Sequence, residues 1–201
     1  MKTVSGLFDN YAEAKSAVKA LESSGIPADQ ISIVSYNADG RYENHFGAAE
    51  GAADGAGLGA VVGGAGGLLT GLGIMAIPGV GPVVAAGWLA ATAVGAVAGA
   101  VAGGAAGGLI GALTDSGVPE TDAHVYAEGV RRGGTLVTAK IDDTAVPDAA
   151  EAILKRSNWV DLVERRNAYV AQGWTKFDET LDPYSPEAVE QERTRYRQPG
   201  V

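Results

Sequence analysis

The stretch that decides the fold runs from Gly55 to Thr114 and reads GAGLGAVVGGAGGLLTGLGIMAIPGVGPVVAAGWLAATAVGAVAGAVAGGAAGGLIGALT. It contains no charged residue, and Asp54 and Asp115 bound it. Small residues recur at every fourth position on both sides of a break that contains Pro78, Gly79, Gly81 and Pro82. The residues that keep this period are Gly55, Gly59, Gly63, Gly67, Gly71, Gly87, Ala91, Gly95, Gly99, Gly103, Gly107 and Gly111.

We interpret residues 55–114 as a hairpin of two long α-helices joined by a turn at 77–82. Glycine costs about 0.5–1 kcal/mol relative to alanine inside a helix, so a flexible linker is the competing interpretation. Linkers, however, carry few Val, Leu and Ile residues, and these fill the gaps between the small residues here. Small residues four apart share neighbouring helical turns and let a second backbone approach closely. The pattern therefore predicts a glycine zipper.

The glycine stripe also predicts self-association. Four residues advance a helix by about 40° beyond a full turn, so the stripe winds around the helix. Either the helices cross in a right-handed sense, or each helix touches several neighbours, which implies a homo-oligomer.

The predicted helices are also long enough to cross a membrane. Residues 55–76 and 83–113 would form helices of about 33 Å and 46 Å, against a hydrocarbon core of roughly 30 Å. Trp88 fits either a membrane interface or a gap between helices.

The overall composition limits the classes of molecule that the chain is expected to bind. The chain has 201 residues, with 15 basic and 24 acidic side chains and a formal net charge of −9. This charge argues against broad nucleic-acid binding and against simple electrostatic docking on anionic lipid. Cysteine is absent, which excludes disulfides and thiolate sites. The N-terminus has no signal-peptide order, so we expect the cytoplasmic side, either at the inner membrane or in solution.

The rest of the chain predicts an α+β domain. Strands are expected at 3–8, 31–36, 135–141 and 159–163, and helices at 10–25, 119–132 and 148–156. Asn10 is expected to be the N-cap of the first helix. Without the hairpin and its adjoining helix, the order is β-α-β twice, which is the ferredoxin-like split order. The expected units are residues 1–54 and 115–166 as the two halves of that domain, 55–114 as the hairpin, and 167–201 as a C-terminal arm with a charged helix.

Several segments resemble bacterial general stress proteins, including heat- and low-temperature-induced members. In the first half these are Val4–Asp9, Ala12–Ala14, Leu21–Gly25 and Ile31–Ile33; in the second half they are Gly117–Ala123, Tyr126–Gly134 and Leu136–Thr138. The resemblance covers residues 3–165, and a glycine-zipper hairpin separates the two halves in many of those proteins. It implies a role in the stress response and membrane association, and it brings no catalytic residue to this chain.

The C-terminal arm carries aromatic residues at Trp174, Phe177 and Tyr184. We expect either a tail that packs on the domain through these rings or an arm that binds a partner and joins subunits. The charged residues beyond Ser185 alternate in sign, as on a solvated helical face.

No catalytic, cofactor-binding or metal-binding site is predicted. Residues 55–60 nearly match a dinucleotide fingerprint, but no strand precedes them and glycine is frequent throughout. His45 and His124 are far apart in sequence. Arg131 and Arg132 fit the C-terminal end of a helix better than an anion site.

Three functions remain for this sequence. The leading hypothesis is a non-enzymatic stress-response protein that self-associates through the glycine zipper and inserts in or lies on a membrane. The second is a soluble homo-oligomer with the hairpins as its core. The third is a small-ligand sensor or an enzyme that uses the face of the sheet.

Overall fold

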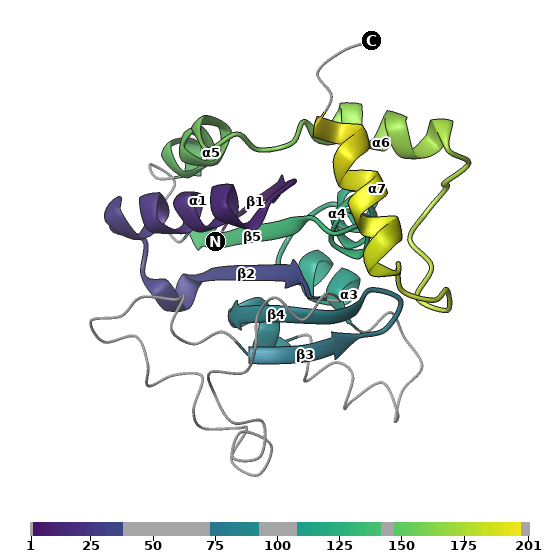
Figure 1. The fold of residues 1–201 in the computed structure, drawn as a ribbon. Coiled ribbons are helices and arrows are strands. Elements are labelled where there is room, and N and C mark those ends of the chain that lie inside the picture. Colours follow the sequence, from purple (N-terminus) through teal and green to yellow (C-terminus); the bar gives the residue numbers. More distant parts are fainter. Residues whose placement is uncertain (1, 38–72, 93–107, 142–146, 198–201) are drawn as a thin grey trace.

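The core of the protein is a five-stranded antiparallel sheet in an α+β fold (Figure 1). The computed structural model describes residues 2–37, 73–92, 108–141 and 147–197. The strand order is β1-β5-β2-β4-β3, and all pairs are antiparallel. The strands are β1 (Lys2–Phe8), β2 (Ile31–Tyr36), β3 (Gly73–Ile77), β4 (Gly81–Gly87) and β5 (Thr135–Ile141).

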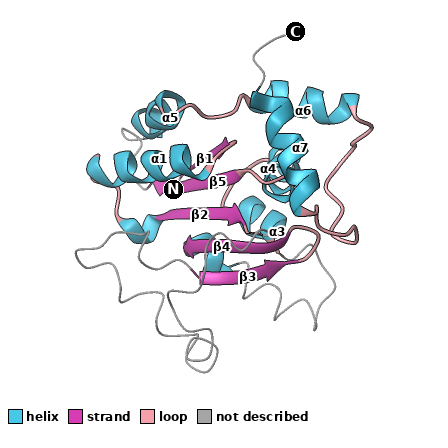
Figure 2. Cartoon of the chain, in the orientation of Figure 1, coloured by secondary structure: helices cyan, strands magenta, loops and turns pink. Residues whose placement is uncertain are grey.

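Helices cover both faces of this sheet, as Figure 2 shows. One face carries α1 (Tyr11–Ser23) and α5 (Pro147–Arg156). The opposite face carries α4 (Glu120–Arg131) with α3 (Leu109–Asp115) packed beside it. Two further helices, α6 (Leu162–Ala171) and α7 (Pro186–Arg197), lie over α4.

The strand residues alternate between two hydrophobic cores. Ile33 of β2 and Val137 of β5 face α1 and α5, whereas Val34 and Leu136 face α4. All four are no more than 1% exposed. Every residue of β2 is buried, because a central strand that is covered on both faces has no solvent side.

Several expected local signals are confirmed. The Asn10 side chain accepts a hydrogen bond from the Glu13 backbone amide at 2.9 Å and caps α1. The predicted strands at 3–8, 31–36 and 135–141 form, and the helices predicted at 10–25, 119–132 and 148–156 form as α1, α4 and α5 within a few residues of those bounds. The chain after Gly133 turns directly into β5, and Gly133 has φ +95°.

The prediction of a helical hairpin is wrong for residues 73–87. These residues form the antiparallel strands β3 and β4. Pro78 and Gly79 make the tight turn between them, with the Val80 amide donating to the Ile77 carbonyl at 3.0 Å. Proline followed by a glycine of φ +70° is the sequence that a type II turn requires. Gly81 and Pro82, which were assigned to the turn, belong to β4.

The zipper residues accordingly separate into two groups. Gly87 ends β4, Ala91 lies in a helical segment at 88–92, and Gly111 lies in α3. Within the described ranges, no helix has both the length and the apolar character needed to cross a bilayer. The other predicted zipper positions lie outside the described residues: Gly55, Gly59, Gly63, Gly67, Gly71, Gly95, Gly99, Gly103 and Gly107.

The prediction of a fourth strand at 159–163 is also wrong, because α6 begins at Leu162. The Asp161 carboxylate accepts hydrogen bonds from the amides of Val163 and Glu164 at 2.9 and 3.0 Å, which is an N-cap. Before this cap, the Val160 amide donates to the Leu7 carbonyl at 2.8 Å. The segment therefore contacts the outer edge of β1 through one hydrogen bond and then turns into a helix.

Gly87 is required by the backbone rather than by helix packing. Its φ is +87°, and a Cβ there would lie 2.0 Å from the Ile31 carbonyl oxygen. We expect Gly87→Ala to lower the free energy of unfolding by about 2 kcal/mol or more, through backbone strain and the clash with β2. Gly25→Ala is the control, because φ there is +95° but a Cβ would meet no atom within 4 Å. Equal losses in denaturant titrations of the two variants would contradict this explanation.

Candidate functional site

A buried carboxylate near the end of α4 organises the polar contacts of the described chain. Glu128 is 1% exposed, and its spacing of three and four residues from Arg131 and Arg132 places all three side chains on one part of the helix. The Arg132 Nε donates to Glu128 Oε1 at 2.6 Å, and Arg131 Nη1 lies 3.4 Å from Oε2. A buried charge requires such partners, because it has lost its water.

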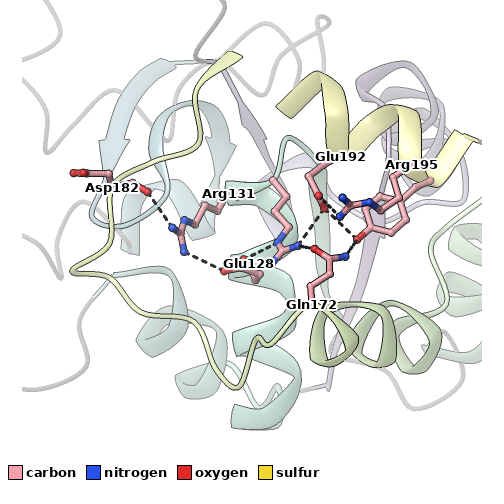
Figure 3. A network of polar contacts seen from close by, with 8 residues as sticks. Glu128, Arg131, Gln172, Asp182, Glu192 and Arg195 are labelled. Atoms are coloured by element: carbon pink, nitrogen blue, oxygen red, sulfur yellow. Dashed lines mark hydrogen bonds and ion pairs between the residues drawn. The ribbon is translucent and has the colours of Figure 1, made fainter. Parts of the chain in front are cut away.

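The network continues into α6 and α7 (Figure 3). Arg132 Nη1 donates to Glu192 Oε2 at 3.1 Å and to Gln172 Oε1 at 2.6 Å. Glu192, which is 6% exposed, also accepts from Arg195 at 2.5 Å. Glu192 lies on α7 and Gln172 directly follows α6, so one guanidinium joins three segments that are distant in sequence.

Aromatic rings enclose the two arginines. The Arg132 guanidinium carbon lies 4.2 Å from the centroid of the Tyr169 ring and 5.5 Å from that of Tyr184. Arg131 lies 5.1 Å from the Tyr184 ring and donates to the Asp182 carbonyl at 3.0 Å. Cations packed on aromatic faces gain electrostatic attraction in a site that excludes water.

A second ion pair fixes α6 to the start of the chain. Arg165 Nη1 lies 2.8 Å from Asp9 Oδ1, and its guanidinium carbon lies 3.8 Å from the centroid of the Tyr196 ring. Tyr196 also donates its hydroxyl to Glu192 Oε2 at 3.2 Å. The two ion-pair systems therefore meet through α7.

The electrostatics keep Arg132 charged and Tyr169 neutral. Burial opposes the charge on Arg132, but its hydrogen bond to Glu128 and the nearby carboxylates raise the pKa of the guanidinium above its ordinary value. Burial likewise raises the pKa of the Tyr169 hydroxyl. Each buried carboxylate in this network is bonded to a guanidinium, so the arrangement fixes helices in place rather than presenting a base or nucleophile.

The predicted aromatic arm packs on its own domain. Phe177 is 7% exposed and belongs to the core between the sheet and α4, and Tyr184 packs against the same core. Trp174 makes an edge-to-face contact with Tyr169, with ring centroids 5.6 Å apart. The Tyr36 hydroxyl donates to the Tyr184 carbonyl, which fastens the arm to β2.

The arm also covers the turn between β3 and β4. A Cβ at Gly79 would lie 2.4 Å from the Glu179 Cα, and one at Gly81 would lie 2.7 Å from the Pro183 Cβ. The absence of side chains at these two glycines lets the arm approach the turn. The structure thus brings together two sets of residues that the sequence singled out for separate reasons.

The other candidate residues lie outside this network, and both His124 Nδ1 and Trp88 Nε1 are buried without a hydrogen-bond partner. His124 Nε2 lies 3.8 Å from the exposed Glu120 carboxylate, and His45 is outside the described residues. Trp88 packs against the core below α4, with Lys140 Nζ 3.7 Å from its ring centroid. Among the described residues, no group of three or more His, Asp or Glu side chains is arranged to hold a metal ion.

Sequence reasoning missed Glu128 and Gln172. It assigned Glu192 to a solvated helical face, which is wrong because Glu192 is buried against Arg132. The spacing of Glu128 from the two arginines was a usable local signal, because residues three and four apart meet on a helix. No comparable signal links Arg132 to Glu192, which lies 60 residues further along the chain.

Removing the charge of Glu128 tests the role of the network. We expect Glu128→Gln to lower the free energy of unfolding by about 3–5 kcal/mol, because two buried guanidiniums lose their shared carboxylate. The control is Glu151→Gln, which removes the more exposed pair with Lys155 at 2.8 Å and should cost less than about 0.5 kcal/mol. Denaturant titration measures both values, and limited proteolysis at Lys176 reports release of the arm. Similar small losses in both variants, with the arm still protected, would contradict the assignment.

Comparison of the chain with protein-family models, with curated proteins and with solved structures found no match.

Proposed function

We propose that this chain is a non-enzymatic stress-response protein that self-associates through its Gly/Ala-rich stretch. The observation that carries the proposal is the position of the β3–β4 hairpin. This hairpin comes from the middle of the uncharged stretch and pairs with β2 over five residue pairs. The two glycine-rich segments, 55–72 and 93–107, are thus joined to a folded body at the same end of its sheet.

The body supports a variant of the ferredoxin-like split fold. β5 lies between β1 and β2, and α1 and α5 cover the same face, which is the arrangement of a split β-α-β unit. The chain departs from that fold in two places. The β3–β4 hairpin extends the sheet beyond β2, and the segment at 159–163 contributes a hydrogen bond instead of a strand beside β1.

Fewer residues support the glycine zipper than the period in the sequence alone indicates. Gly87 has a backbone role in β4, so it no longer supports a helical stripe. The period of four remains in Gly55–Gly71 and Gly95–Gly107, where it would let helical backbones from several copies approach one another.

Two locations follow from this proposal, and two measurements separate them. A zipper that binds lipid would bring the protein into the membrane fraction, whereas a zipper that packs only on itself would leave a defined particle in solution. Because the chain has a net charge of −9, membrane binding would depend on the apolar segment. We therefore expect flotation with neutral phosphatidylcholine vesicles to be at least as strong as with anionic vesicles. Particle mass with and without detergent identifies the soluble alternative.

The zipper itself is tested by placing a large side chain on or beside the period. We expect Gly63→Leu and Gly99→Leu to reduce the particle mass measured by light scattering, because leucine would separate the backbones. The neighbouring variants Gly64→Leu and Ala100→Leu add the same side chain off the period and should retain the mass. Unchanged mass in all four variants, or an equal loss in all four, would contradict the zipper.

A further inference from the structure

β3 forms one edge of the sheet, and its outer side pairs with no other strand of the described chain. The opposite edge, β1, receives the hydrogen bond from Val160. β3 has five residues, Gly73–Ile77, in continuous register with β4 and without a bulge. It contains no charged residue and no proline, so it lacks two of the features with which edge strands prevent pairing.

The backbone groups on this outer side can be assigned. The Asn37 amide donates to the Pro82 carbonyl at 2.8 Å, so the carbonyl of Pro82 points toward β2. Backbone groups alternate in direction along an antiparallel strand, so those of Gly81, Val83 and Ala85 point toward β3. Their partners are Ile77, Met75 and Gly73. The N–H and C=O groups of Ile74 and Ala76 therefore point outward.

We propose that β3 of a second copy of this chain pairs with this edge, antiparallel and centred on Met75. In this register Ile74 of each copy lies opposite Ala76 of the other, and the outward groups of both residues make four hydrogen bonds. A register centred on Ala76 would place Pro78, which has no N–H, opposite Ile74. The pairing is isologous, so two copies close into a dimer with a continuous ten-stranded sheet.

Charge and exposure place a contact between two copies at this edge. Each chain carries a net charge of −9, so two copies repel over most of their surfaces, but β3 and β4 are uncharged. Ile74 is 44% exposed, and the pairing would cover it with the partner strand. This contact lies on the sheet and does not depend on the glycine zipper.

The register is tested by a single cysteine, because the chain itself has none. In a pair centred on Met75, the two Met75 Cα atoms are about 4.5 Å apart, which is within the range for a disulfide. We expect Met75→Cys to form a covalent dimer rapidly under mild oxidation. Ile74→Cys should react much more slowly, because the residues at position 74 of the two copies lie diagonally across the strand pair, about 7–8 Å apart. Val163→Cys, an exposed position on α6, gives the rate of random collision.

Sedimentation of variants without cysteine tests the same contact without a covalent bond. Ile74→Lys should raise the dimer dissociation constant at least about tenfold, because it places a lysine in the apolar pair. Val163→Lys should leave the constant unchanged.

Two results would overturn the proposal. One is a chain that carries only Gly63→Leu and sediments as a monomer, because the sheet contact should survive loss of the zipper. The other is an equal oxidation rate for the Ile74→Cys, Met75→Cys and Val163→Cys variants. Loss of the larger particle in the zipper variants, with cross-linking of the Met75→Cys variant intact, would show that the two contacts are separate.

Discussion

The buried carboxylate of Glu128 is the constraint on which the packing of the C-terminal half depends. A charge that is 1% exposed must be neutralised where it lies, and Arg131 and Arg132 do so from the same helix. Arg132 then needs a second acceptor, which Glu192 of α7 provides. One buried charge on α4 thereby determines where the last helix of the described chain docks.

The C-terminal arm, which packs on α4, also contacts the sheet. Between α6 and α7 the chain passes over the β3–β4 turn, where Gly79 and Gly81 leave room for Glu179 and Pro183. Phe177 enters the core beside Val80 and Ile77. The uncharged stretch is therefore held on one side by the ladder to β2 and on the other by the arm, which leaves β3 as the outermost strand.

The assignment of residues 73–87 shows how a period in the sequence can be misread. Gly87 falls on the period of four, but its position is explained by a positive φ and a contact with β2. The Pro78–Gly79 pair predicted a turn correctly, and the flanking Val and Ile residues fit strands as well as helices. Whether residues 73–87 form a helix or strands depends on their contact with β2, and no pattern of neighbouring residues predicts that contact. The segment after Trp159 was misread for a different reason, since a local signal, the Asp161 cap, favours a helix over the strand that its valines indicate.

The sequence by itself determined the α+β class, the capped helix after Asn10, the strands at 31–36 and 135–141, and the turn at Pro78 and Gly79. These features depend on residues close together in the chain, where capping, alternation and turn geometry act. Only the tertiary structure decided that 73–87 joins the sheet, that the arm packs on α4, and that Glu128 meets Glu192 through Arg132. Those contacts join residues 40 to 60 positions apart. Burial of apolar surface stabilises them, and the ion pairs offset the cost of burying the charges.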